Sequence, residues 1–280
     1  MLKGEIAALT AAFLWALATV IFGRLGKALN PLVLNLAKGG IAIALIGLTL
    51  LLQHNWQPNL STTAFAWLLL SGVVGIGFGD TAYFNAINCL GPRRALLMES
   101  LAPPLTAIIA FIFLQERLSA ISWCGILLTV LGVTWVISER VPAHDQAPYN
   151  LRAGVIWGLL AELGQASGAV MSRGVLVDTA IDPLWSGLLR IAAGAVVLLG
   201  WLCWSSNIGA QLRPLRSPQL LLALGLAAIF GTYLGIWLQQ IAFKFTPAGI
   251  AQALLATSPL FVLPIAASLG DRITARAVLG

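Results

Sequence analysis

Charged side chains within long apolar stretches are the residues of this sequence best able to do chemistry. Five lie inside such stretches: Lys38, Asp80, Glu99, Glu162 and Arg190. A charge at the centre of a membrane helix costs about 2.5–3.5 kcal/mol on insertion scales, which makes it a functional candidate by default. Three acids and two bases could pair in a shared cavity, where the bases would attract a carboxylate or fix the cavity's shape. The competing interpretation is a set of structural salt bridges between helices.

Polar and aromatic side chains accompany these charges at helical spacing. Asn35, Tyr83 and Gln165 each stand three residues from one of the charges. We predict that such side chains line a path for an amphipathic solute. The alternatives are interhelical hydrogen bonds, worth about 0.6 kcal/mol each, or anchoring of the tryptophans at the lipid interface. The predicted lining also includes Trp15, Tyr233, Trp237, Gln240 and Gln252.

Prolines inside apolar stretches give a second kind of candidate. Pro103 and Pro104 fall within one stretch, and Pro259 falls within another. A proline inside a helix leaves a carbonyl without its amide partner and bends the helix. Membrane helices tolerate such a break where protein or a cavity covers it. We therefore predict hinges on the cavity side, with passive kinks as the alternative.

Signals for a cofactor, a metal or catalysis are weak. The three cysteines lie far apart without CxxC spacing, and His54 and His144 fall in predicted loops, so we expect no metal and no cofactor. A membrane-embedded enzyme could use Asp80, Glu99 and His54 as acids and bases. No nucleophile or metal-ligand pattern accompanies them, so we do not expect an enzyme.

Composition identifies the solvent of this chain as lipid. Of its 280 residues, 59% are hydrophobic and 9% are charged, whereas a soluble domain has roughly 45–50% apolar and about 25% charged residues. Soluble enzymes and nucleic-acid-binding proteins are therefore excluded. The net charge of +6 is scattered over loops, which suits an anionic membrane surface better than a nucleic acid partner.

The apolar stretches are long enough for membrane helices, each of which needs about 20 residues. A tenth stretch begins at Thr274 and stops at Gly280. Seven helical residues rise only about 10 Å, too little to cross the bilayer. The nine predicted spans are Glu5–Gly23, Pro31–Leu52, Ala64–Ile87, Arg94–Leu114, Ala120–Ser138, Ala153–Val170, Leu184–Trp204, Gln219–Ala242 and Ala248–Leu269.

An internal repeat organises these spans. Shifting the chain so that Gly91 meets Thr246 aligns 35 residues without a gap and superimposes prolines and a turn acid followed by arginine. With a small further shift, Lys38 meets Arg190. Each half then holds five helices, the last one cut short. Because five is odd, the second half enters the membrane from the opposite side, and inverted repeats of this kind are typical of secondary transporters.

The ordered motifs resemble those of the EamA-like transporters of the drug/metabolite transporter superfamily. They are the Ala11–Ala16 opening, a basic residue after Asn-Pro or Asp-Pro, the Gly91-Pro92 helix entry and the Leu114–Leu118 turn. The resemblance implies an all-α, polytopic membrane protein of two inverted five-helix repeats, residues 3–139 and 152–280. Members of this family have a complete tenth helix, and their fifth and tenth helices pack outside the substrate cavity.

The resemblance also implies a function. We expect a secondary active or facilitative transporter in the plasma membrane, the inner membrane of a bacterium, that exports small metabolites such as amino acids or drugs by alternating access. One of the three acids, Asp80, Glu99 or Glu162, is expected to carry a coupling proton. The expected partners are a small-molecule substrate and lipid, with no nucleic acid, for a monomer or homodimer. The alternative is a non-transporting assembly or regulatory subunit.

The orientation in the membrane has two conflicting indications. With the N-terminus in the cytoplasm, the cytoplasmic segments would carry four lysines and arginines and the opposite loops ten. The positive-inside rule therefore favours an external N-terminus, whereas the family resemblance implies a cytoplasmic one.

Overall fold

The computed structural model describes residues 2–26, 28–55, 60–90, 95, 98–137, 150–204 and 211–261. Within these residues every regular element is a helix. The first repeat contains α1 (Leu2–Leu25), α2 (Pro31–Leu52), α3 (Thr62–Gly72), the π-helix η1 (Val73–Gly79), α4 (Asp80–Leu90), α6 (Ala102–Leu114) and α7 (Ala120–Ile137).

The second repeat follows the same plan. It contains α8 (Leu151–Asp178), α9 (Pro183–Trp204), the short 3₁₀-helix η2 (Arg213–Arg216), α11 (Pro218–Ala227), the π-helix η3 (Ala228–Leu234), α12 (Gly235–Phe245) and α13 (Ala248–Leu255). In both repeats a π-helix interrupts the third membrane-crossing segment. Neither interruption was predicted, since each of these segments was expected to be one α-helix.

Local sequence fixes where several helices begin. The side chains of Asn30, Ser61 and Asn150 cap α2, α3 and α8 by accepting hydrogen bonds from amides of the first turns. These residues satisfy donors that have no partner within the helix. The predicted start of the sixth span, Ala153, is thus within two residues of the start of α8 at Leu151. The predicted end, Val170, is not, because α8 continues to Asp178. The charges that end its apolar stretch do not end the helix.

The outer surface is suited to lipid. Large apolar side chains such as Phe113, Ile121 and Leu128 are exposed on the outside of the bundle. Because open backbone cannot be satisfied within a bilayer, helices are the expected spanning elements. Five helical stretches among the described residues are long and apolar enough to cross it: Leu2–Phe22, Leu32–Leu52, Thr62–Leu90, Pro183–Trp204 and Pro218–Phe245. The protein is therefore an integral, multi-pass membrane protein.

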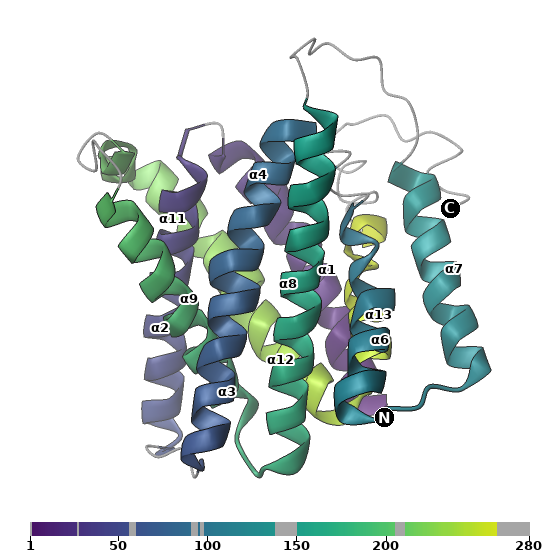
Figure 1. Ribbon diagram of the computed structural model, residues 1–280. Coiled ribbons are helices and arrows are strands. Elements are labelled where there is room, and N and C mark those ends of the chain that lie inside the picture. Colours follow the sequence, from purple (N-terminus) through teal and green to yellow (C-terminus); the bar gives the residue numbers. More distant parts are fainter. Residues whose placement is uncertain are drawn as a thin grey trace.

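The two repeats run in opposite directions and interlock. In Figure 1, α1 rises from the N-terminus, whereas α8 descends from the other end of the bundle. The π-helix η1 of the first repeat packs against α8 and α9 of the second. Its counterpart η3 packs against α1 and α2. The centre of the bundle is therefore built from both repeats, in agreement with the predicted inversion.

Glycines allow backbone-to-backbone contact between α8 and the segment of α3 and η1. A Cβ atom added to Gly168 would lie 2.9 Å from the Ser71 carbonyl oxygen and 3.0 Å from the Gly75 Cα atom. One added to Gly164 would lie 3.2 Å from the Gly79 Cα atom. Small residues let membrane helices approach backbone to backbone in this way. The glycine run of η1 is thus a packing surface.

We expect Gly168→Ala to destabilise the protein by about 1–3 kcal/mol, because the added methyl group overpacks this contact. Thermal unfolding in detergent measures the change. The matched control is Gly225→Ala in α11, since a Cβ added there meets nothing within 4 Å. Equal unfolding temperatures for the two variants would contradict the packing argument.

Candidate functional site

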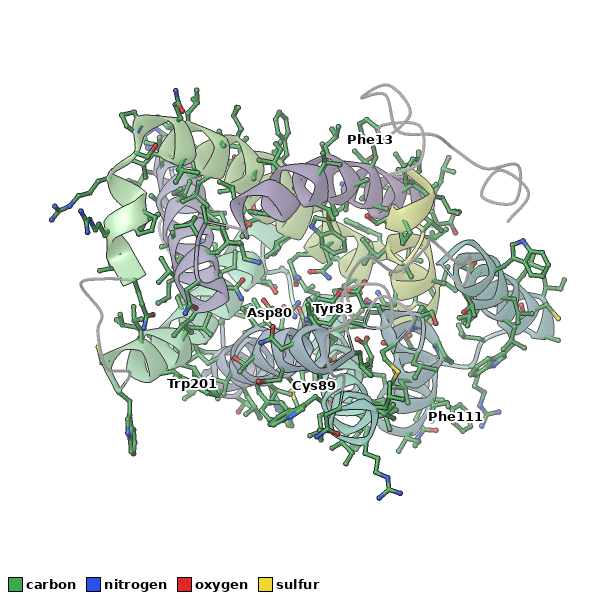
Figure 2. All side chains as sticks on the ribbon, turned by 90° about the horizontal axis from the view of Figure 1, so that it is seen from above. Phe13, Asp80, Tyr83, Cys89, Phe111 and Trp201 are labelled. Atoms are coloured by element: carbon green, nitrogen blue, oxygen red, sulfur yellow. The ribbon has the colours of Figure 1, made fainter. Side chains whose placement is uncertain are left out.

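A cavity of about 380 Å³ lies where the two repeats meet. In Figure 2 the bundle is seen from above, with Asp80 and Tyr83 near its centre. The lining comes from helices of both repeats. It includes ten of the thirteen side chains predicted for a solute path: Trp15, Asn35, Lys38, Asp80, Tyr83, Glu99, Glu162, Gln165, Arg190 and Gln252. All five charges predicted to lie at membrane depth are therefore brought together, while their contact with a substrate stays a prediction.

Two interrupted helices border the cavity. Residues 98–99 are helical, the chain turns at Ser100–Leu101, and α6 begins at Ala102. In the second repeat α13 ends at Leu255, the chain turns at Ala256–Thr257, and residues 258–261 are helical again. Cavity-lining residues flank both turns. Interrupted helices at matching places in inverted repeats commonly form transporter binding sites, because they free backbone groups at membrane depth.

The prolines occupy the starts of helical pieces. Pro103 and Pro104 are in the first turn of α6, where no amide donor is needed, and neither lines the cavity. The helix interruption predicted at these prolines lies in the turn just before them. Pro259 follows the second turn and does line the cavity. Hinge motion at these prolines stays a prediction.

Asp80 links the acidic and basic parts of the cavity. Its Oδ1 atom accepts a 2.9 Å hydrogen bond from Gln165 Nε2. Its carboxylate interacts electrostatically with both Lys38 and Arg190. Asp80 begins α4 directly after η1, so the π-helix determines where this carboxylate points. Of the three acids, Asp80 is the one that interacts electrostatically with both bases, without a direct ion pair within 4.0 Å among these described residues.

The other two acids form a group next to Asp80, which also interacts electrostatically with Glu99. Tyr83 hydrogen-bonds the Glu99 side chain, and Glu162 interacts electrostatically with Glu99. The cavity therefore has an acidic part beside α4 and α8 and a basic part on α2 and α9, with Asp80 between them. No metal-binding group of three or more His, Cys, Asp or Glu residues occurs among the described residues.

Aromatic residues of α1 close one wall. Trp15 Nε1 donates a 2.7 Å hydrogen bond to the Gly231 carbonyl oxygen in η3, which joins the two repeats. The Lys38 ammonium lies 5.6 Å from the centre of the Phe22 ring, within cation–π range. Phe22 was not predicted, because a lone aromatic near a helix end is normally an interfacial anchor.

Tyr233, Trp237 and Gln240 do not line the cavity. The Tyr233 hydroxyl is 2.8 Å from Thr49 Oγ1, and its ring stacks on Trp237. Gln240 is fully buried and its Oε1 atom accepts hydrogen bonds from Ser172 and Ser186.

The predicted face of this segment is displaced by one residue. Besides Gly231, the cavity-lining residues are Thr232, Ile236 and Gln239, and each of these three stands one residue before a predicted position. They follow the same helical spacing as the predicted residues. The spacing therefore showed which residues share a face, but polarity alone did not show which face points to the cavity.

Glu116 and Arg173 tie the repeats together at the end of the bundle that holds the N-terminus. Glu116 Oε1 accepts a 2.6 Å bond from Arg173 Nε, and Oε2 accepts a 2.8 Å bond from the Ala248 amide at the start of α13. Arg173 Nη1 donates to the Phe243 carbonyl oxygen at 2.5 Å. We call this pair of residues the Glu116–Arg173 latch. The sequence singled out Glu116 only as the acid of a repeated turn.

The same end of the bundle is tightly packed. Leu68, Leu176 and Phe243 are buried in one apolar cluster that contains residues of both repeats. Gly4 contacts Thr246, and the Lys3 ammonium lies 4.5 Å from the centre of the Phe245 ring. On α1 the cavity lining starts only at Trp15. Packed protein therefore separates the cavity from the N-terminal end.

Comparisons with known proteins agree with this architecture. One solved crystal structure superposes on this fold with a TM-score of 0.79 and 17% sequence identity. The superposition covers 99% of this chain and 91% of that protein. This likeness concerns the fold alone. An uncharacterized transporter of Sinorhizobium sp is 27% identical over 129 residues, 45% of this chain and 89% of that protein. An uncharacterized transporter of Vibrio cholerae is 26% identical over 225 residues, 72% of this chain and 74% of that protein.

The family assignment rests on two matched stretches, one in each repeat. The sequence matches the EamA-like transporter family over residues 2–138 and again over 152–280. Nearly the whole chain is covered, and the resemblance inferred from the motifs is confirmed. With its inverted helical repeats and membrane-spanning segments, the chain belongs to the EamA-like transporter family.

Proposed function

We propose that this protein exports small amphipathic metabolites, such as amino acids or drugs, across the plasma membrane by alternating access. The supporting observation is the polar cavity between inverted repeats, separated by packed protein from the N-terminal end. The interrupted helices beside the cavity give both repeats a place to bend. Exchange of the two repeat conformations would close the cavity at one end and open it at the other.

Coupling to protons is part of the same proposal. Glu99 and Glu162 lie close enough to interact, and both line the cavity. Two neighbouring carboxylates away from bulk water repel one another, and a bound proton relieves that repulsion. One of them, or Asp80, would bind a proton in one orientation and release it in the other. The export direction is taken from the family resemblance.

Efflux from proteoliposomes tests the function. Vesicles containing the purified chain are loaded with an equimolar mixture of the twenty amino acids, and mass spectrometry follows their release. We expect at least one amino acid to leave faster than from protein-free vesicles, and an inward proton gradient to accelerate its release. Binding to the detergent-solubilised protein with no release from vesicles would contradict transport and favour the assembly-subunit alternative.

A further inference from the structure

Unsatisfied hydrogen-bond donors gather on the α2 and α9 side of the cavity. Arg190 is 3% exposed, and neither its Nε nor its Nη1 atom has a hydrogen-bond partner among the described residues. Asn35 is 4% exposed, and its Nδ2 atom also has no hydrogen-bond partner among the described residues. Both residues line the cavity. A buried donor without a partner costs about 1–3 kcal/mol, so unfilled donors at a cavity wall indicate a missing ligand.

The backbone around Arg190 holds these donors in place. Gly72 lies directly against the main chain of Arg190, and a Cβ atom added there would collide with it. The guanidinium crosses the glycine face of η1, where a Cβ added to Gly75 would lie 3.4 Å from Nη2. The α2 helix, which carries Asn35 and Lys38, packs against α9. These donors therefore belong to a rigid wall built from both repeats.

The charges on this wall show what kind of ligand is missing. Lys38 and Arg190 supply two positive charges, and Asp80 is the acid that interacts with both. One Asp80 oxygen is already bonded to Gln165. Glu99 and Glu162 belong to the acidic part of the cavity. Two bases thus face the single acid that interacts with both, beside nitrogen atoms that can only donate hydrogen bonds. A single anionic group complements both features.

We infer that this wall is the binding subsite for one carboxylate of the transported molecule. The donors of Arg190 and Asn35 hydrogen-bond the carboxylate oxygens, and Lys38 supplies a second positive charge. The substrates are then small monoanionic carboxylates or zwitterions. Neutral amides and dianionic phosphates fit poorly, because the first lack the charge and the second carry one charge too many. The inference rests on the proposed transport function and adds the chemical group that is recognised.

Matched acid and amide probes test the subsite. The probes are acetate and acetamide, 3-phenylpropionate and 3-phenylpropionamide, and L-phenylalanine and L-phenylalaninamide, with inorganic phosphate as the dianion. Thermal stabilisation of the purified chain in detergent measures binding. We expect at least one acid to bind well over tenfold more tightly than its amide, and phosphate to bind weakly. Equal binding of every acid and its amide, or no binding by any acid, would overturn the inference.

Variants of Arg190 test whether this residue causes the preference for acids over amides. Arg190→Gln should reduce acid binding about ten- to a hundredfold, the value of hydrogen bonds to a charged group, while amide binding changes little. Arg190→Lys keeps the positive charge but lacks the planar guanidinium that can donate two parallel hydrogen bonds to a carboxylate. Its affinity for acids should therefore lie between those of the native protein and Arg190→Gln. Arg152→Gln, at an exposed arginine of α8, is the matched control. An unchanged acid-to-amide ratio in Arg190→Gln would contradict the assignment.

A second substitution tests the wall without removing a charged partner. Asn35→Asp places a carboxylate of the protein beside Lys38 and Arg190, where it should take the substrate's place. We expect this variant to unfold at a higher temperature and to lose its preference for acids. Retained acid preference would overturn the subsite. The contrary outcomes are an unchanged acid-to-amide ratio in Arg190→Gln and a retained acid preference in Asn35→Asp. If amino acids still leave the vesicles when either is observed, the transport proposal stands and only the subsite fails. Absence of any efflux would instead reject transport itself.

Discussion

Bridging positions 116 and 173 with a short bis-methanethiosulfonate reagent is expected to reduce transport to the level of protein-free vesicles. The Glu116–Arg173 latch joins the turn after α6 to α8, and therefore joins the two repeats. Alternating access requires this end to open, so a covalent bridge between Glu116→Cys and Arg173→Cys holds the cavity in one orientation. Reduction with dithiothreitol should restore efflux. Vesicle efflux before and after reduction measures both effects.

The bridging experiment needs a background without reactive thiols. Cys89, Cys124 and Cys203 are free in the native chain and are first replaced by serine. Each single-cysteine variant, treated with the same reagent, is the control for modification without bridging. Undiminished transport by the bridged protein would show that this end of the bundle stays shut throughout the cycle. The alternating-access part of the proposal would then be wrong.

Removal of the Asp80 side chain is expected to cause the largest loss of stability among single substitutions in the cavity. Asp80→Ala leaves Lys38 and Arg190 without the acid that interacts with both. Asp80 is partly exposed to the cavity and forms no direct ion pair with either base, so we expect a loss of about 1–3 kcal/mol, between the values for exposed and buried charge pairs. Thermal unfolding in detergent, followed by size-exclusion chromatography, measures the change.

The origin of that loss can be checked by a compensating substitution. Asp80→Ala combined with Arg190→Gln should be more stable than Asp80→Ala alone, because the uncompensated charge is gone. Asp178→Ala, at an exposed acid near the end of α8, should change stability by less than about 0.5 kcal/mol. A double variant no more stable than Asp80→Ala would show that Asp80 acts by packing rather than by charge.

Five of the nine predicted spans, and the five charges that line the cavity, could be predicted because lipid enforces simple rules. Every membrane helix needs a long apolar stretch, and every charge within one stands out. The bounds of α2 agree with the predicted span at both ends. The bounds of α8 do not, because the apolar stretch ends before Arg173 while the helix continues to Asp178. Arg173 was therefore assigned to a loop, and the latch was missed.

The details of the cavity depend on backbone features that have no sequence signal of their own. Tertiary packing decides which face of the segment containing Tyr233 points to the cavity, because helical spacing shows only that Tyr233, Trp237 and Gln240 share a face. The turn at Ser100 likewise depends on tertiary packing, because the two prolines that follow it suit both a kink and a helix start. The part of the last predicted span beyond residue 261, and the stretch from Thr274, lie outside the described residues.

The paired π-helices have a consequence for how sequences of this fold can diverge. Loss of one residue from η1 would turn everything after it by about 100°, the rotation per residue of an α-helix. Asp80 would then leave the cavity even though every residue type had been kept. Substitutions in these two segments should consequently be accepted far more readily than single-residue insertions or deletions. Among distant relatives, the spacing between η1 and the acid that follows it should vary less than the identity of the residues between them.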